Sequence, residues 1–392
     1  MEAFLTGGMI SVTGVLILLC LASYLEARDP PRVSVDRPVS LPDPAPRVSV
    51  IVPARNEEKN IPRCLEGLLA QDYPNLEIIV VEDRSSDRTG EVVDAFRERD
   101  GRVRKVVGAP LEKGWLGKSH AAHQGCRAAT GEWLLFVDAD TWLHPRGVTA
   151  SMGHVLQKNV DMLSLYPHFV CESFWEKVIQ PAVGRMILIS GPVDFVNSRR
   201  RIFRIFTMAI GQFLLFRRSV YEAVGGHEAI RDRVVEDVEL SRAVKRAGYH
   251  LNFLYGTDVL NTRMYKTFTE LWRGWSRSFY PAMGHNPVLA ILQALLLFVF
   301  GTLPYLVMPV AGLLWAAGVG SGTVRTLFGL GLFQYGLLFL TTYAVRARLR
   351  EYPEYFYTCP LGGLMVQWIS VHSIYSYALK RRVLWKDRDL NA

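Results

Sequence analysis

The sequence has little cysteine, and the spacing of the few that it has excludes two common kinds of site. The five cysteines are Cys20, Cys64, Cys126, Cys171 and Cys359. Their number is odd and their intervals are wide and irregular, so that they form neither a paired-cysteine metal motif nor a framework for disulfides. We therefore expect the protein to work in a reducing compartment.

The N-terminal apolar run lacks the marks of a cleaved signal peptide. Residues 9–25 carry no charged side chain, Glu2 is the only charged residue before them, and no small-residue cleavage pattern is clear after Cys20. We predict a retained membrane anchor over residues 1–27, with a short interfacial helix as the alternative because a run of about 17 residues is near the minimum for a span. Arginines follow directly, which by the positive-inside tendency predicts that the next domain is cytoplasmic.

The charged residues are biased towards the basic side. Lysine and arginine number 45, against 37 aspartates and glutamates. This surplus fits a protein at anionic lipid headgroups as well as one that binds nucleic acid, and composition does not separate the two. The hydrophobic share of 49% is high for a purely soluble protein, and the excess lies in residues 9–25 and 288–345, where Arg325 is the only charge.

These runs divide the chain into a membrane anchor, a linker, a globular domain and a second membrane region. Residues 28–46 contain six prolines and are expected to form an extended linker. In the globular domain, residues 47–286, we expect segment 173–210 to lie partly in the headgroup layer, because it is rich in arginine and bulky apolar residues. A disordered basic loop is the alternative for this segment. Residues 287–392 form the C-terminal membrane region.

The number of C-terminal spans is open from the sequence. Residues 288–318 are long for one span, and their prolines allow a kinked helix or a tight hairpin. Residues 323–345 predict one span, and residues 357–379 predict another. The basic clusters 346–350 and 380–382 cannot both be cytoplasmic if one full span separates them, which a re-entrant last segment would resolve.

The globular domain alternates short apolar runs with amphipathic stretches. The expected strands are residues 48–52, 77–81, 103–107 and 133–137. The expected helices are residues 61–69, 88–99 and 119–129. Strands that alternate with single helices predict an α/β fold with a parallel sheet covered on both faces, whose ligands lie beyond the carboxyl ends of the strands.

Two carboxylates leave the last of these strands. Asp138 and Asp140 flank Ala139 directly after the apolar run 133–137. Unpaired charge at the exit of a buried strand is costly unless an ion or a ligand compensates it, and a divalent cation that bridges a diphosphate does so. A solvated turn is the alternative for such a triplet taken alone.

Further polar residues follow the neighbouring strands. Arg55 and Glu57 lie beyond the first strand, and Glu82 and Asp83 lie beyond the second. One of the latter carboxylates can accept the imide N–H of a uracil ring, while helix capping explains the rest of that loop. Lys118 lies on a flexible loop before a helix, where it can reach a phosphate or a base, with a solvated surface lysine as the alternative.

Four ordered motifs across roughly residues 47–280 resemble glycosyltransferase family 2. They are Val52 to Glu57, Val80 to Thr89, Val137 to Asp140, and Gly225-Gly226-His227-Glu228 leading to Val235-Glu236-Asp237. The resemblance implies a GT-A fold with N-terminal and C-terminal transmembrane helices. It also implies an inverting reaction on a nucleoside-diphosphate sugar, usually a UDP-sugar, with Mg²⁺ or Mn²⁺.

The resemblance also implies a role for each motif residue. The donor side would be formed by Pro53, Ala54, Arg55, Glu57, Glu82, Asp83, Lys118 and Asp138. Asp140 would ligate the metal, with Asp138 on the ribose or metal side. Asp237, paired with Glu236, corresponds to the general base, because an acceptor hydroxyl must lose its proton as it attacks the anomeric carbon.

The chain departs from the family pattern at two points. Glu82 stands where the second motif commonly has aspartate. Either Glu82 or Asp83 can therefore be the carboxylate that contacts the base. Processive members carry a Gln/Arg-x-x-Arg-Trp signature, whereas residues 271–278 read Leu-Trp-Arg-Gly-Trp-Ser-Arg-Ser, which argues against polymer extrusion. The candidate acceptor-side residues of this segment are Arg273, Trp275 and Arg277. A basic interfacial helix is the alternative.

A narrower resemblance concerns residues 211–275, which are similar to the bacterial branch of carotenoid-acid and hopanoid-associated glycosyltransferases. It implies an apolar lipid acceptor. Together with the missing processive signature, the apolar runs and the arginines after the first run, this predicts a nonprocessive, multi-pass enzyme of the cell membrane with a cytoplasmic catalytic domain and no nucleic-acid partner. A polyprenyl-phosphate sugar transferase is the first rival, since a phosphate acceptor needs no general base. A catalytically degenerate membrane scaffold is the second, and the retained carboxylate pairs argue against it.

Overall fold

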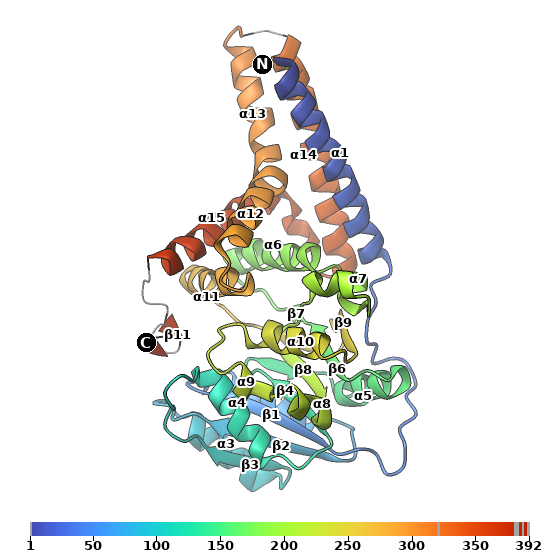
Figure 1. Ribbon diagram of the computed structural model, residues 1–392, viewed down its shortest axis with the longest axis vertical. Coiled ribbons are helices and arrows are strands. Elements are labelled where there is room, and N and C mark those ends of the chain that lie inside the picture. The colour runs from blue at the N-terminus through green and yellow to red at the C-terminus, as the bar shows by residue number, and fades with distance from the viewer. Residues whose placement is uncertain (1, 320–321, 380–383, 386–387, 390–392) are drawn as a thin grey trace. The chain divides into compact units, whose positions relative to one another are not determined.

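The computed structural model describes residues 2–319, 322–379, 384–385 and 388–389 (Figure 1). The chain divides into two compact units, each assembled from segments that are distant in the sequence. Unit 1 comprises residues 1–30, 171–189 and 265–381, and unit 2 comprises residues 31–170, 190–264 and 382–392. The described part of unit 1 is helical, whereas unit 2 contains the β-sheets.

Four parallel strands form one half of the main sheet of unit 2. They are β1 (Val48–Ala54), β2 (Leu76–Glu82), β3 (Val103–Val107) and β4 (Trp133–Val137). Between them run α2 (Ile61–Leu69), α3 (Thr89–Arg99) and α4 (Gly117–Ala128). Helix α4 packs closely on the sheet at Gly125, where a Cβ atom would lie 2.5 Å from Cγ2 of Ile51. The predicted succession of strands and helices is therefore confirmed in this half.

The other half of the sheet is mixed, whereas the sequence pattern predicted parallel strands only. Strand β8 (Phe213–Arg217) lies antiparallel between β4 and β6 (Met162–Tyr166), and β9 (Leu251–Tyr255) pairs parallel to β6. The strand order is β3-β2-β1-β4-β8-β6-β9. Because β8 is reversed, its first residue, Phe213, pairs with Val137 at the carboxyl end of β4. The residues directly before β8 therefore lie at the carboxyl end of β4, where ligands are expected.

A small second sheet begins directly after Asp140. Its strands, in spatial order, are β5 (Thr141–Leu143), β10 (Leu260–Thr262) and β7 (His168–Phe169). The remaining helices of unit 2 are α5 (Gly147–Lys158), α7 (Val193–Asn197), η1 (Arg201–Phe206), α8 (Arg218–Ala223), α9 (Gly226–Ala229) and α10 (Glu236–Arg246). Two short strands, β11 (Leu384–Trp385) and β12 (Arg388–Asp389), pair antiparallel.

The start of the proline-rich segment is part of unit 2. Arg32 forms an isolated parallel bridge with Tyr255 of β9, and the N–H of Val33 donates to the carbonyl of Tyr255 at 3.0 Å. Val33 and Val35 are buried, and Nη1 of Arg146 donates to the carbonyl of Val35 at 2.6 Å. The segment therefore packs along the sheet edge at these residues, where the sequence predicted an extended linker.

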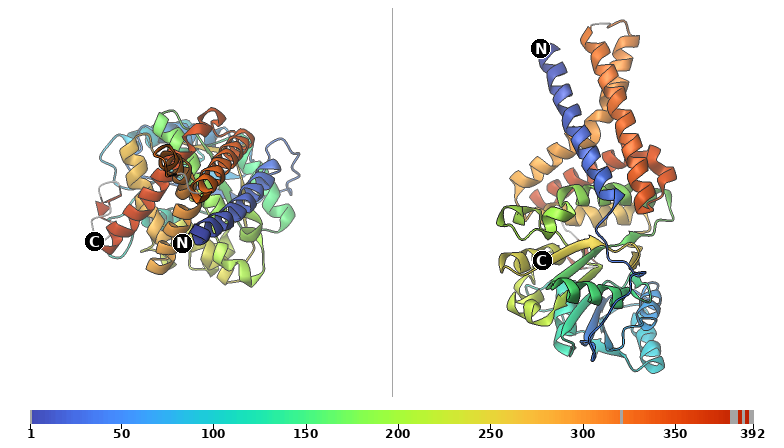
Figure 2. Two further views of the ribbon diagram at one scale, coloured as in Figure 1. Left: turned by 90° about the horizontal axis from the view of Figure 1, so that it is seen from above. Right: turned by 90° about the vertical axis from the view of Figure 1, so that its right-hand side faces the viewer.

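Three helices of unit 1 are long and apolar enough, among the residues that the structure describes, to cross a membrane (Figure 2). They are α1 (Glu2–Arg28), the continuous helix over α12 (Pro287–Leu296), η2 (Leu297–Thr302) and α13 (Leu303–Ala316), and α14 (Gly322–Leu349). Helix α14 packs against both α1 and α13. The amide Nε2 of Gln334 donates to the hydroxyl of Thr13 at 2.8 Å, and both residues are buried.

Pro304 and Pro309 of segment 287–316 give an interrupted helix and not a hairpin. The turn η2 is a π-helix directly before Leu303-Pro304, and Pro309 lies inside α13. A proline lacks the N–H of a regular helix, and a local π turn absorbs the resulting break in the ladder. The last expected span, residues 357–379, forms η3 (Pro353–Thr358) and α15 (Cys359–Ala378), and α15 does not meet the same criteria of length and apolarity. The basic cluster 380–382 lies outside the described residues.

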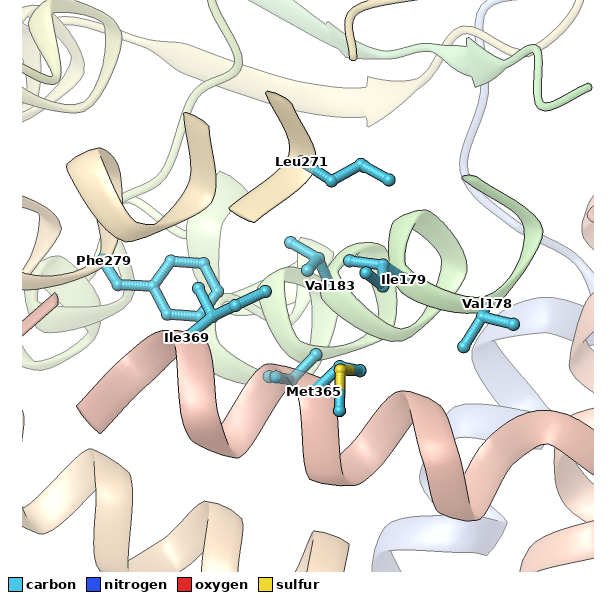
Figure 3. Packing of buried hydrophobic residues seen from close by; sticks show 8 residues of the cluster. Val178, Ile179, Val183, Leu271, Phe279, Met365 and Ile369 are labelled. Carbon is cyan, nitrogen blue, oxygen red and sulfur yellow. The ribbon is translucent and has the colours of Figure 1, made fainter. Parts of the chain in front are cut away.

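Helix α15 instead packs with α6 (Phe174–Ser190) and α11 (Phe268–Ala282) in an apolar cluster of unit 1 (Figure 3). Its buried members are Val178, Ile179, Val183, Leu271, Phe279, Met365, Val366 and Ile369. Gly362 allows α15 to approach α6 closely, because a Cβ atom there would lie 3.0 Å from the carbonyl oxygen of Val178. The hydroxyl of Ser373 accepts the N–H of Tyr280 at 2.9 Å, which adds a polar link between α15 and α11.

Candidate active site

The loops after β1 and β2 are held together by hydrogen bonds. Nη1 of Arg55 donates to the carbonyl oxygens of Asp83, at 2.7 Å, and Arg84, at 2.8 Å. The N–H of Asp83 donates to the carbonyl of Ala54 at 2.8 Å, and Oδ1 of Asn56 accepts the N–H of Ser86 at the same distance. The side chain of Arg55, predicted to border the nucleoside, therefore fixes the backbone of the neighbouring loop.

Glu82 and Asp83, at the end of β2, differ in the environment of their carboxylates. Oε1 of Glu82 accepts the N–H of Ser85 at 2.5 Å and so closes its own turn. Asp83 is buried, and its Oδ1 lies beside Gly108, where a Cβ atom would come within 3.4 Å of it. One oxygen of the Glu82 carboxylate is thus occupied by a hydrogen bond from the backbone of its own loop.

The carboxylates of Asp138 and Asp140 emerge from β4 on either side of buried Ala139. Oδ1 of Asp140 lies 3.5 Å from the hydroxyls of Thr141 and Thr262, at the limit of hydrogen bonding, so that β5 and β10 flank it. Below them, burial and the negative charges of Asp140, Asp138 and Glu57 raise the pKa of the Cys64 thiol. The floor of the site therefore carries a concentrated negative charge.

Lys118, in the first turn of α4, is the cation of this cluster. Its Nζ lies 2.6 Å from Oδ1 of Asp138 and 2.7 Å from Oε1 of Glu236. Burial alone would lower the pKa of Lys118, but the two carboxylates outweigh it and hold that pKa well above its usual value. Lys118 therefore remains charged and joins the exit of β4 to the start of α10.

Glu236 and Asp237 occupy the first turn of α10, where the helix dipole favours negative charge. Burial would raise the pKa of Glu236, but Lys118 opposes it and lowers that pKa overall. For Asp237, burial and the neighbouring Glu236 charge raise the pKa to about 7. The two adjacent carboxylates thus differ: Glu236 is ionised in a salt bridge, and Asp237 exchanges its proton near neutral pH.

The reversal of β8 brings a glycine and a glutamine against this cluster. A Cβ atom at Gly211 would lie 3.2 Å from Nζ of Lys118, 3.4 Å from Oδ2 of Asp237 and 3.5 Å from Oε1 of Glu236. Nε2 of Gln212 lies 3.5 Å from Oδ2 of Asp138. Neither residue was predicted to belong to the site. The Gly-Gln pair directly before an apolar strand could have indicated it.

Three buried rings, those of Tyr221, His227 and Phe136, pack together in the segment before α10. The hydroxyl of Tyr221 accepts the N–H of His227 at 3.0 Å and lies within hydrogen-bonding distance, 2.8 Å, of Nδ1 of the same residue. Both rings pack against Phe136 of β4, with centroids 5.4 and 4.8 Å away. Burial lowers the pKa of His227 to about 3, so that its imidazole is neutral.

The ring of Tyr221 leaves no room for a side chain at Gly226, which has a φ of 50°. A Cβ atom there would lie 2.5 Å from the Tyr221 ring. We expect Gly226→Ala to lower stability by about 1–3 kcal/mol through overpacking, in addition to the cost of a positive φ. Gly114→Ala is the matched control, because Gly114 has a φ of 83° and open space around it. Thermal unfolding of both variants in detergent isolates the clash, and equal melting temperatures would contradict it.

The contact at Gly211 predicts a functional effect with little change in stability. We expect Gly211→Val to reduce turnover about tenfold, because displacing charged groups by a fraction of an ångström is enough to misalign a site. Gly101→Val is the control, since a Cβ atom at Gly101 meets nothing within 4 Å. Steady-state rates and melting temperatures are measured together; a Gly211 variant with the parental rate would show that the packing against Lys118 is immaterial.

The donor set suits a divalent cation that is shared with a ligand. Carboxylate oxygens are the ligands that Mg²⁺ and Mn²⁺ prefer. Across the described residues, no three His, Cys, Asp or Glu side chains converge into a complete metal site. Mg²⁺ is commonly held by one or two carboxylates together with substrate phosphates, and Asp140 with Asp138 fits that arrangement.

The proposed acceptor-side residues belong to α11 of unit 1, whereas the charged cluster belongs to unit 2. Nε1 of Trp275 donates to Oε1 of Gln180 at 2.9 Å, and its ring meets Tyr265 edge to face, with centroids 5.9 Å apart. The carbonyl of Arg277 accepts the hydroxyl of Tyr377 at 3.0 Å. Arg273 lies on the same helix, and an acceptor role for Arg273, Trp275 and Arg277 stays a prediction.

Comparison with known proteins identifies relatives of this arrangement. Residues 49–225 match the family described as Glycosyl transferase family 2. The 4,4'-diaponeurosporenoate glycosyltransferase of Staphylococcus aureus (strain MRSA252) is 29% identical over 267 residues, which cover 65% of this chain and 66% of that protein. The match therefore spans just under two thirds of that relative's length.

A solved structure shares the fold. The mannosyltransferase from Pyrobaculum calidifontis, in complex with GDP-Man and Mn²⁺, superposes with a TM-score of 0.56 at 20% sequence identity. The superposition covers 96% of this chain and 99% of that one. The similarity supports the predicted GT-A-like α/β fold with long apolar helices at both ends.

Proposed function

We propose that this chain, whose residues 49–225 match glycosyltransferase family 2, transfers a sugar from a nucleotide sugar to a hydroxyl of a lipid acceptor. The observation that carries the proposal is the convergence of Lys118, Asp138 and Glu236, with Asp237 beside them. Such a site supplies positive charge for a diphosphate and a carboxylate for a proton, and sugar transfer from a nucleotide needs both.

On the donor side, Lys118 is suited to hold the diphosphate. In the structure its Nζ forms salt bridges with Asp138 and Glu236. A phosphate oxygen of the donor would compete with these carboxylates for the same Nζ atom. We assign the base contact to Asp83, because the Glu82 carboxylate closes its own turn. A UDP-sugar is the proposed donor class, with Pro53, Ala54, Arg55 and Glu57 lining the nucleoside side.

Asp140 and Asp138 would hold the proposed cation, which is Mg²⁺ or Mn²⁺. When bound, such an ion neutralises the charge that develops on the leaving diphosphate. The neighbouring hydroxyls of Thr141 and Thr262 orient the Asp140 carboxylate towards one position. The Mn²⁺ in the Pyrobaculum mannosyltransferase structure is consistent with this assignment.

On the acceptor side, Asp237 is the proposed general base. The acceptor oxygen attacks the anomeric carbon, the bond from that carbon to the diphosphate breaks, and Asp237 takes the hydroxyl proton. A pKa of about 7 suits this task, because the carboxylate is largely ionised just above neutral pH and yet basic enough to accept a proton. Attack from the face opposite the leaving group inverts the anomeric configuration.

The proposed acceptor is an apolar lipid, modified once per reaction at the cytoplasmic face of the cell membrane. Three candidate spans in unit 1 support a membrane location. The Staphylococcus relative supports an apolar lipid as the class of acceptor, since it is a diaponeurosporenoate glycosyltransferase. The acceptor that its name prints is a carboxylate, so the hydroxyl rests on Asp237 and not on this relative.

The test is direct transfer by the full-length protein in detergent. The protein is incubated with total membrane lipid, Mn²⁺ and either a UDP-hexose or GDP-mannose, and the lipids are extracted for mass spectrometry. We expect a lipid with a hexose-sized mass increment, which Asp140→Ala does not produce. Failure of every donor to label any lipid, with a protein that still binds nucleotide, would contradict the lipid-acceptor proposal.

A further inference from the structure

The segment Arg201–Phe206 of unit 2 repeats the triplet Arg-Ile-Phe and forms the 3₁₀ helix η1. A 3₁₀ helix has three residues per turn, so that residues three apart lie on the same face. The repeat therefore sorts its side chains into three faces. The arginine face is Arg201 and Arg204, the isoleucine face is Ile202 and Ile205, and the phenylalanine face is Phe203 and Phe206.

The phenylalanine face is the one that packs on the protein. Phe203 stacks on Phe195 of α7 with ring centroids 4.6 Å apart and an interplanar angle of 5°, and Phe206 lies 5.1 Å from Phe195. This inward packing fixes the rotation of η1. The other two faces are accordingly presented to the surroundings of unit 2.

The base of this element is firmly anchored. Nδ2 of Asn197 donates to the carbonyl of Phe253 at 3.1 Å, and Oδ1 of Asn197 accepts the N–H of Phe253 at 2.6 Å. Nζ of Lys245, near the end of α10, donates to the carbonyls of Val196 and of Ser198, the latter at 3.1 Å. These bonds tie α7 to β9 and α10, and η1 in turn packs on Phe195 of α7.

The exposed faces combine apolar surface with positive charge. Ile202 is 74% exposed and Ile205 is 81% exposed. Arg199, Arg200 and Arg201 are exposed beside them, and Asp194 is the one acidic residue between positions 190 and 206. Two large apolar side chains held side by side in water are unfavourable unless a partner covers them.

We propose that residues 199–206 are a docking element for an anionic lipid bilayer, in which the isoleucines enter the boundary of the acyl chains and the arginines contact the headgroups. A bilayer surface offers these two environments together, whereas a nucleic-acid backbone would match the arginines and leave the isoleucines in water. The segment also follows directly on α6 of unit 1, the unit that contains the candidate membrane spans. The proposal does not depend on the sugar transfer proposed above.

The test uses the full-length protein in nanodiscs, with a photo-crosslinking amino acid, benzoylphenylalanine, in place of Ile205. Replacement of Val107, which is 70% exposed on β3, is the matched control. After illumination, lipid adducts are counted by mass spectrometry in discs of phosphatidylglycerol with phosphatidylcholine, and of phosphatidylcholine alone. Melting temperatures and nucleotide binding show that each variant is folded.

We expect lipid adducts at position 205 and few at position 107 in the anionic discs. The adduct yield at 205 should fall at least about fivefold in neutral discs, and likewise when Arg201→Glu and Arg204→Glu are combined, since each arginine near an anionic surface changes binding by about that factor. Equal yields at 205 and 107 would overturn the proposal. Equal yields at 205 in both kinds of disc would refute the role of the arginines, and loss of the adduct on adding excess oligonucleotide would point to nucleic acid instead.

Discussion

Asp237→Asn is expected to reduce sugar transfer by about 10²–10⁴-fold, because it removes the proposed general base and keeps the size and much of the hydrogen bonding of the side chain. Oδ1 of Asp237 accepts the N–H of Val238 at 2.8 Å, and the amide oxygen of asparagine can accept the same bond. Nucleotide binding should therefore survive. The measurement is the transfer rate at saturating donor, beside a nucleotide titration of the same protein.

The pH profile gives this prediction a second readout. The pKa of Asp237 is raised to about 7, so its carboxylate loses its proton as pH rises through that value, and transfer by the parent protein should rise with it and then level off. In the asparagine variant this limb of the profile should vanish. Asp36→Asn, at an exposed position, is the control and should keep both the rate and the limb.

The outcomes of this experiment separate the proposed reaction from its rivals. An acceptor that is already ionised, such as a polyprenyl phosphate or a lipid carboxylate, has no proton to lose, and near-parental transfer by Asp237→Asn would favour such an acceptor. Loss of nucleotide binding in step with transfer would instead place Asp237 in the donor site or in the fold. A scaffold without activity predicts no transfer by the parent protein at all.

Asp140→Ala should abolish the metal-dependent part of donor binding. We expect the affinity for nucleotide diphosphate in the presence of Mn²⁺ to fall by about 10²-fold or more, since even outer partners of metal ligands are worth 10–100-fold. Affinity without metal should change little. Calorimetry with UDP and with GDP, each with and without Mn²⁺, measures this difference.

A matched control is available on α3 of the same unit. Glu98 is exposed, and Glu98→Ala removes one negative charge at a position away from the β4 exit. It should leave the metal dependence at the parental value. If Asp140→Ala binds nucleotide and Mn²⁺ as tightly as the parent does, the assignment of Asp140 to the cation is wrong, whatever the transfer assay shows.

The sequence was sufficient for those parts of the site that depend on local pattern. Asp138 and Asp140 follow a recognisable apolar strand, so that a parallel α/β topology predicts their side of the sheet. Glu236 and Asp237 were proposed from the family resemblance alone, and the helix α10 that they begin was not predicted. Lys118 was harder, because a lysine in a glycine-containing loop is usually solvated. Its pairing with two carboxylates depends on the distance between α4 and α10, which no short motif encodes.

The direction of β8 and the hydrogen-bond partners of individual side chains could not be predicted from such local patterns. Phe213 to Phe216 is an apolar run that reads alike in a parallel or an antiparallel strand, and its reversal follows from the long excursion of the chain before it. The part played by Gly211 depends on that reversal. By position, Glu82 and Asp83 were equal candidates for the base contact, and the sequence could not show that Oε1 of Glu82 accepts the N–H of Ser85 in its own turn.

The interleaving of the two units limits how this protein can be shortened. The chain passes between them after residues 30, 170, 189, 264 and 381, so that unit 2 is not a continuous stretch of sequence. A fragment over residues 47–284 would retain α6 and α11 but lose α15, leaving Val178 and Val183 without the methionine and isoleucine that cover them (Figure 3). Such a fragment should aggregate. Excision of residues 171–189 together with truncation after residue 264, starting from Pro31, instead follows the boundaries of unit 2 apart from residues 382–392.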